Sequence, residues 1–121
     1  MKIAAVTENG KTLSNHFGRA PYFRVLTIQE NKIVADETRI KPYHGHSEGQ
    51  VHPHNHTLHE DMFAPIVDCE ILLCGGMGEP AFQKAIAAGL EVILTGGEIN
   101  DAITAYLSGH LSSDTRRIHQ H

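Results

Sequence analysis

The first third of the chain alternates apolar runs with polar turns. Lys2–Thr7 is a short apolar run that predicts a buried strand, and Glu8–Ser14 is polar with an Asn-Gly pair typical of a turn. Pro21–Gln29 has strand-forming composition with partial alternation. After a tight turn at Glu30–Asn31, the more polar Lys32–Lys41 completes a predicted antiparallel hairpin, with its second strand at the edge of the sheet.

The second half alternates short apolar strands with helical segments that are bounded by proline and glycine. The predicted elements are a strand at Glu70–Cys74, a turn at Gly75–Gly78, a helix from Pro80 to Gly89, a strand at Glu91–Leu94 and a helix at Glu98–Ser108 closed by Gly109. A strand, helix and strand in this order favour parallel pairing with a right-handed crossover. We therefore expect an α/β fold.

The middle and the end of the chain lack such a clear pattern. Pro42–Asn55 is rich in His, Gly and Pro, which indicates a long surface loop. A capping box, Thr57-x-x-Glu60, predicts a short helix. Its apolar face would comprise Leu58, Met62, Phe63, Ile66 and Val67. We expect one domain over residues 1–121, with the His-rich loop at about 42–56 and a loose polar tail after about residue 110.

Composition and charge argue against several classes of function. The chain has 121 residues, 40% hydrophobic and 20% charged, as in an ordinary globular domain. Its formal net charge of −4 argues against binding to nucleic acid or to an anionic membrane surface. With no signal peptide or membrane span in the pattern, we expect a cytoplasmic protein with Cys69 and Cys74 as thiols. If both lie on one strand, their spacing points them to opposite faces, so they should neither bond nor share a metal.

Histidine is the compositional anomaly. There are ten, and six of them fall between positions 44 and 59. These candidate metal ligands are His44, His46, His52, His54, His56 and His59. Neutral imidazole binds zinc, nickel and copper, so the loop could hold such an ion; the alternative is a solvated loop with only weak metal affinity.

Two turns could also carry chemistry. His16 lies between a strand end and a glycine turn, where it could point into a crevice or merely belong to a capped turn. Gly76–Ala81 matches G-x-G-x-x-A after a strand, with Glu98 placed where a ribose-binding acid could lie, but Glu79 and Pro80 oppose nucleotide binding there. Cys74, at the end of that strand, could ligate soft metal or be a buried core residue. No hydrolase motif or P-loop is present, so we assign no catalytic residue and expect no enzyme.

Two blocks of the sequence resemble a known family. Ser14–Phe23 is similar to the S-x-H-F-G-R-A-x-x-F signature of the dinitrogenase iron–molybdenum cofactor biosynthesis family, which includes NifX-like carriers, C-terminal domains of NifB-type proteins and orange proteins. Cys74–Gly78, followed by Ala81–Phe82 and Ala88–Val92, resembles its G-G-x-G…A…G-I-x-V block. The resemblance extends from Lys2 to about Gly109. The His-rich loop is longer and richer in imidazole than that family requires.

The resemblance implies a ribonuclease-H-like α/β fold, with a mixed sheet of about five strands flanked by helices. It implies binding or delivery of a metal–sulfur cluster of the iron–molybdenum or molybdenum–copper type, without turnover, in exchange with a cluster donor or acceptor protein. It also implies a cluster ligand at His16. The residues expected to line the site are His16, Arg19, Cys74, Gly75, Gly76, Met77 and Gly78. The alternatives are buffering of Zn, Ni or Cu by the loop, and nucleotide binding. We expect a monomer or weak homodimer.

Overall fold

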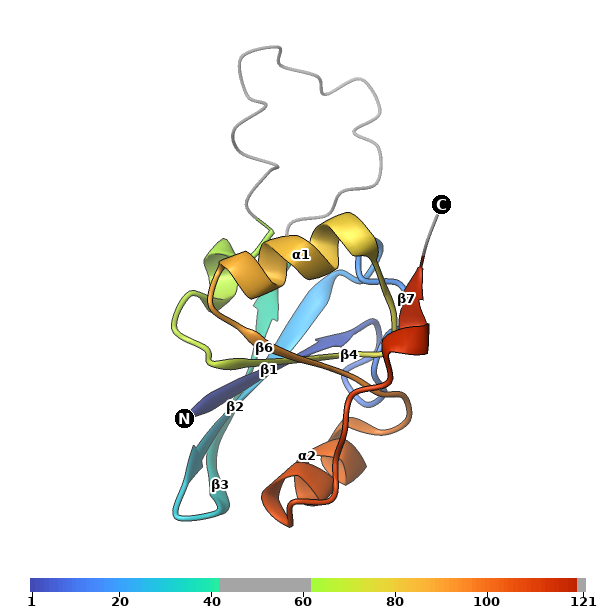
Figure 1. Ribbon diagram of the computed structural model, residues 1–121. Helices are drawn as coiled ribbons and strands as arrows, with labels where there is room; N and C mark the ends of the chain where they lie inside the picture. The colour runs from blue at the N-terminus through green and yellow to red at the C-terminus, as the bar shows by residue number, and fades with distance from the viewer. Residues whose placement is uncertain (42–61, 120–121) are drawn as a thin grey trace.

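The computed structural model describes residues 1–41 and 62–119, which form a mixed sheet with a helix on each face (Figure 1). The strand order is β3-β2-β1-β4-β6. These strands are β1 Lys2–Thr7, β2 Tyr22–Gln29, β3 Lys32–Ile40, β4 Ile71–Cys74 and β6 Glu91–Leu94. The other elements are α1 Glu79–Ala87, α2 Ile99–Leu107, the short strands β5 Met77–Gly78 and β7 Ile118–His119, and 3₁₀ turns at Ala64–Ile66 and Thr115–Arg117.

Strand pairing confirms the predicted topology. β1 pairs antiparallel with β2 and parallel with β4, and β4 pairs parallel with β6. β3 pairs with β2 at the edge of the sheet. Glu30 and Asn31 connect these two strands with φ of 52° and 65°, a left-handed pair that fits the twist of a two-residue hairpin turn.

Two cores lie on opposite faces of the sheet. Leu72 belongs to the core under α1, and its neighbour Leu73 belongs to the core under α2. Figure 1 shows the two helices on either side of the sheet. The central strands are therefore apolar on both faces, which explains why their sequences read as continuous hydrophobic runs.

The segment before β4 differs from the predicted helix. The capping box and Leu58 lie outside the described residues, and the described part contains only a 3₁₀ turn at Ala64–Ile66. Phe63 and Ile66 are buried as expected, but Val67 is 82% exposed. The expectation for Val67 was wrong because the chain leaves the helical path after one short turn, so the helical spacing no longer applies.

The two cysteines also differ from the expectation. Cys69 lies before β4 and not on it, and both thiols belong to the core under α1. The inference that they face opposite ways was conditional on one strand through both positions, and the structure does not meet this condition. Both are free thiols, as predicted.

The tail after residue 110 was predicted to be loose, and this too is corrected for residues 111–119. Leu111 packs against the core under α2, and Ile118 packs against the core under α1. The Asp114 N–H donates to Leu94 O at 2.9 Å, and the Leu94 N–H donates to Ser113 Oγ at 2.9 Å. Two apolar side chains and these bonds hold the segment along β6. Within the part of the chain that the structure describes, no helix is long and apolar enough to cross a membrane.

Candidate functional site

The carboxyl ends of the three parallel strands β1, β4 and β6 meet at one edge of the sheet, and two of the sequence motifs described above lie side by side there. The turn that carries His16 follows β1, and the glycine turn follows β4. The Phe17 N–H donates to Gly76 O at 3.1 Å, and the Gly75 N–H donates to Ser14 O at 2.7 Å. Two backbone hydrogen bonds thus join the two motifs at the edge where open α/β sheets place ligands.

The His16 turn is closed by its own hydrogen bonds. The N–H groups of Arg19 and Ala20 donate to His16 O at 3.0 and 3.1 Å. The His16 N–H donates to Ser14 Oγ at 3.0 Å, and that hydroxyl donates to Glu8 Oε2 at 2.7 Å. The His16 and Arg19 side chains are exposed. The backbone that carries the His16 imidazole is therefore held in place before any ligand arrives.

Gly75 is required by the close approach of the His16 turn. A Cβ added there would lie 2.7 Å from Ser14 O and closer still to Asn15 Oδ1, so no larger residue fits without movement of the backbone. Glycine at position 75 is therefore explained by close packing. Its N–H is already used in a hydrogen bond within the protein, to Ser14 O.

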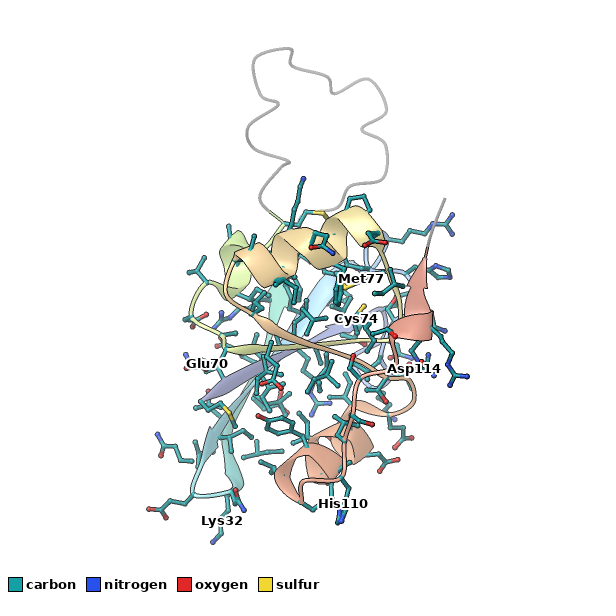
Figure 2. All side chains as sticks on the ribbon, in the orientation of Figure 1. Lys32, Glu70, Cys74, Met77, His110 and Asp114 are labelled. Carbon is teal, nitrogen blue, oxygen red and sulfur yellow. The ribbon has the colours of Figure 1, made fainter. Side chains whose placement is uncertain are left out.

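Cys74 and Met77 lie inside the molecule. Cys74 is 0% exposed and Met77 is 1% exposed, and Figure 2 shows both between the sheet and α1. The Cys74 thiol faces Gly76 O at 3.1 Å, and burial raises its pKa to about 12. Both side chains belong to the core under α1. That Cys74 and Met77 also line a cluster site stays a prediction.

The tail supplies a cation that the sequence did not point to. Arg117 Nη1 donates to Gly75 O at 3.1 Å, and its guanidinium lies against Gly96, where an added Cβ would be 3.1 Å from Nη1 and Nη2. β7 pairs in parallel with β5, Ile118 opposite Met77 and His119 opposite Gly78. The glycine turn is therefore held between the His16 turn and the tail. Nothing in a short polar tail marked Arg117 for this place.

A second cation, Lys41, lies on the inner side of the His16 turn. Lys41 is 1% exposed, and Nζ is 4.4 Å from the centroid of the Phe17 ring. Phe17 in turn stacks on Phe63, with ring centroids 5.4 Å apart. Burial lowers the pKa of Lys41 to about 8, an effect partly offset by Cys74. No local pattern predicted a buried lysine here, because Lys41 directly follows the polar edge strand β3.

Several predicted residues gain no structural support. His44, His46, His52, His54, His56 and His59 all lie outside the described residues. Among residues 1–41 and 62–119, no three side chains of His, Cys, Asp or Glu gather to hold a metal ion.

Glu79 and Pro80 occupy the first turn of α1, as expected from the sequence, and no side chain caps that helix by a hydrogen bond.

Comparison with known proteins defines the class. A model of the family described as "Dinitrogenase iron-molybdenum cofactor" matches residues 1–109, so the chain belongs to this family. The membership associates it with the biosynthesis or binding of that cofactor or a related cluster, and with partners that handle such clusters. A search of curated proteins gave no significant match.

Solved structures agree with this fold. The chain is 25% identical to the protein PH0822, with a TM-score of 0.70 and coverage of 94% of this chain and 95% of the other. It is 24% identical to the apo form of the orange protein of Desulfovibrio gigas, with a TM-score of 0.67 and coverage of 93% and 92%. It is 19% identical to MJ0327 of Methanococcus jannaschii, with a TM-score of 0.67 and coverage of 95% and 93%. The last two likenesses support the fold alone. Arg117 and β7 lie beyond the residues that the family model matches.

Proposed function

We propose that this protein is a non-catalytic carrier that binds a metal–sulfur cluster as cargo at the His16 turn and exchanges it with a donor or acceptor protein. The observation that carries the proposal is the exposed His16 on a hydrogen-bonded turn at the carboxyl edge of the sheet. An imidazole nitrogen there is a ligand for iron, molybdenum or copper. Arg19, exposed on the same turn, adds positive charge next to a sulfidic and therefore anionic cargo.

We infer further that the domain has a ribonuclease-H-like architecture, used here without nuclease chemistry. The support is the sheet order β3-β2-β1-β4-β6, in which only β2 runs against its neighbours β1 and β3. Membership in a cofactor family supports binding over turnover. A cytoplasmic location and a monomer or weak homodimer remain part of the proposal.

Two alternatives are carried by fewer observations. Buffering of Zn, Ni or Cu would rest on histidines 44–59, which lie outside the described residues. Nucleotide binding would place an anion at the start of α1, where Glu79 adds negative charge and Pro80 lacks an N–H. Neither alternative is supported by a structural observation comparable to the exposed His16 on its hydrogen-bonded turn.

The decisive experiment is metal and acid-labile sulfide analysis, with a visible spectrum, on untagged protein purified without oxygen from its own host. Iron, molybdenum or copper with stoichiometric sulfide is the expected result. A His16→Ala variant that is produced and purified in the same way should show most of the visible absorption of the wild type missing. The matched control is His110→Ala, because His110 is an exposed histidine directly after α2. Zinc or nickel without sulfide, unaffected by His16→Ala, would contradict the proposal.

A further inference from the structure

Lys41 has no evident structural reason to be an ammonium group. It is 1% exposed, and its backbone N–H donates to Pro21 O at 2.8 Å. Among the described residues, Nζ has no hydrogen-bond partner. Burying a charge without an anionic partner is strongly unfavourable, so natural proteins tolerate it chiefly where a ligand uses the charge.

The place of Lys41 connects it to the proposed site. Its Nζ lies over the ring of Phe17, and the Phe17 N–H holds the glycine turn through Gly76 O. Phe17 directly follows His16 in the chain. Lys41 Nζ therefore lies against the inner side of the turn whose outer side presents His16.

We propose that Lys41 is an anion-recognising residue of this site, whose buried positive charge selects a sulfidic, net-negative metal cluster over free metal cations. This inference rests on the proposed function and names its cargo class. The aromatic ring and the neutral Cys74 thiol provide little screening, so the charge acts through a low effective dielectric and attracts an anion at the turn. The same charge repels Zn²⁺ or Cu²⁺, which explains how one imidazole could favour a preassembled cluster.

The burial of Lys41 also makes its protonation responsive to cargo. Burial lowers its pKa to about 8, so part of the population is neutral in mildly alkaline solution. A bound anion would favour the charged form. Without cargo the buried ammonium is unfavourable, and the attraction of a bound anionic cluster would offset this unfavourable free energy.

The test is an anaerobic titration with tetrathiomolybdate, a dianionic sulfidic metal complex that absorbs visible light. Lys41→Met retains the length of the side chain and removes the charge, and we expect it to bind at least about tenfold more weakly than the wild type, since loss of a buried charge partner typically costs more than that. Lys32→Met, on the exposed hairpin turn, makes the same change in net charge and should bind like the wild type.

The outcomes separate the two proposals. Wild-type binding with an unchanged Lys41→Met affinity overturns the role of Lys41 and leaves the carrier function standing. A wild type that does not bind, together with a host-purified protein free of sulfide, overturns both. Equal competition by sulfate would make this a general anion site and overturn the sulfidic assignment.

A second measurement guards against misfolding of the variant. The wild type can be expressed with ¹³C-labelled lysine, and the lysine Cε signals can be followed by NMR during the same titration. The Lys41 Cε signal should shift on addition of tetrathiomolybdate, whereas that of Lys32 should not. An unmoved Lys41 signal at saturating tetrathiomolybdate overturns the inference without any substitution.

Discussion

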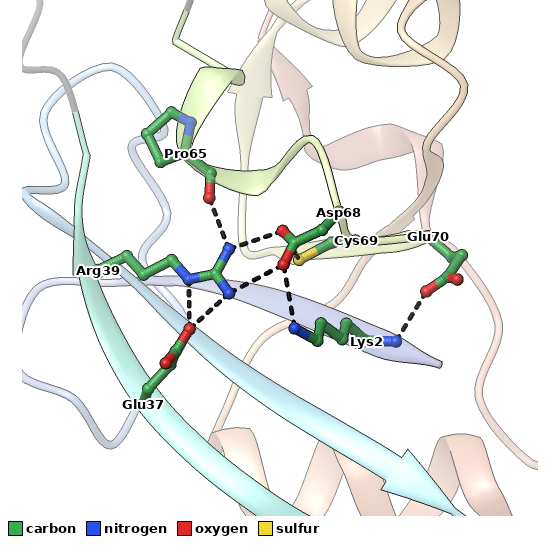
Figure 3. Close-up of polar contacts among 7 residues, drawn as sticks. All are labelled: Lys2, Glu37, Arg39, Pro65, Asp68, Cys69 and Glu70. Carbon is green, nitrogen blue, oxygen red and sulfur yellow. Dashed lines mark hydrogen bonds and ion pairs between the residues drawn. The ribbon is translucent and has the colours of Figure 1, made fainter.

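Arg39 and Lys41 are two cations that lie two residues apart at the end of the hairpin, and their surroundings are opposite. The Arg39 guanidinium bonds Asp68 in a bidentate pair at 2.7 and 3.0 Å, donates to Pro65 O at 2.7 Å and pairs with Glu37 (Figure 3). Lys41 faces an aromatic ring and, among the described residues, no hydrogen-bond acceptor. A cation whose acceptors are all in place stabilises the fold, whereas the lack of acceptors at Lys41 is the observation from which we infer its role in recognition.

The acidic partner of Arg39 shows the strength of this pairing in its pKa. Hydrogen bonds from Arg39, and then from Lys2, hold the pKa of Asp68 well below its usual range, and the Asp68 side chain is 42% exposed. Arg39 joins β3 to the segment before β4, two regions far apart in the sequence. The network fastens the edge strand β3, which among the described strands pairs only with β2.

The largest expected effect comes from Arg39→Met. The Arg39 side chain is 21% exposed and has four acceptor contacts, so its removal should lower the free energy of unfolding by about 2 kcal/mol. Urea denaturation measures this change. The control is Arg116→Met, because Arg116 is 90% exposed and its pair with Asp114 should contribute far less than the contacts of Arg39. Equal losses in the two variants would contradict the structural role given to Arg39.

The next effect has the opposite sign. Lys41→Met should raise the free energy of unfolding at pH 7 by about 1 kcal/mol, because replacing an unpaired buried charge by an apolar side chain outweighs the lost cation–π contact. Urea denaturation of the cargo-free protein, with Lys32→Met as control, checks the sign. A variant that is less stable and still binds tetrathiomolybdate normally would make Lys41 an ordinary structural residue.

The pH dependence of that difference sharpens the test. The folded-state pKa of Lys41 is lowered from 10.5 to about 8, so the unfolded chain binds more protons between these values and the stability contribution rises with pH across this window. The advantage of Lys41→Met should therefore be full below pH 8 and shrink towards pH 10.5. Burial also raises the pKa of the facing Cys74 thiol, but both proteins carry this thiol, so its contribution cancels in the difference between them.

Asp68 should have a smaller effect on the free energy of unfolding, and this effect should be seen at acid pH. Because its folded-state pKa is lowered, its contribution is present above the unfolded value of about 3.9 and is lost as the pH falls below that value. The urea midpoint of the wild type should fall between about pH 5 and 3, and it should fall less steeply in Asp68→Asn. Combining Asp68→Asn with Arg39→Met should add little further change, because both remove the same interaction.

The contrast between the two cations also shows what sequence reasoning could and could not reach. Strand positions, the hairpin turn and the helix ends followed from local signals such as the positive-φ pair Glu30–Asn31 and the stop at Gly89. The two turns of the candidate site were predicted from the motif around His16 and from the glycines at Gly75–Gly78. The docking of Arg117 and the burial of Lys41 depend on contacts 42 and 24 residues along the chain, to Gly75 and Phe17. No local pattern of residues records contacts of that kind.

The smallest effect is expected at Lys2, and it tests the premise of the whole comparison. Lys2 Nζ shares the Asp68 carboxylate with Arg39 at 3.1 Å, but the Lys2 side chain is 36% exposed and has no second acceptor among the side-chain hydrogen bonds of the described residues. Lys2→Met should therefore change the free energy of unfolding by less than about 0.5 kcal/mol, and 0.5 M NaCl should abolish the difference because salt screens exposed pairs. If Lys2→Met destabilised the protein as much as Arg39→Met, proximity to a carboxylate would matter more than burial and saturation of acceptors. The same argument that gives Arg39 its structural role and Lys41 its role in recognition would then fail at both positions.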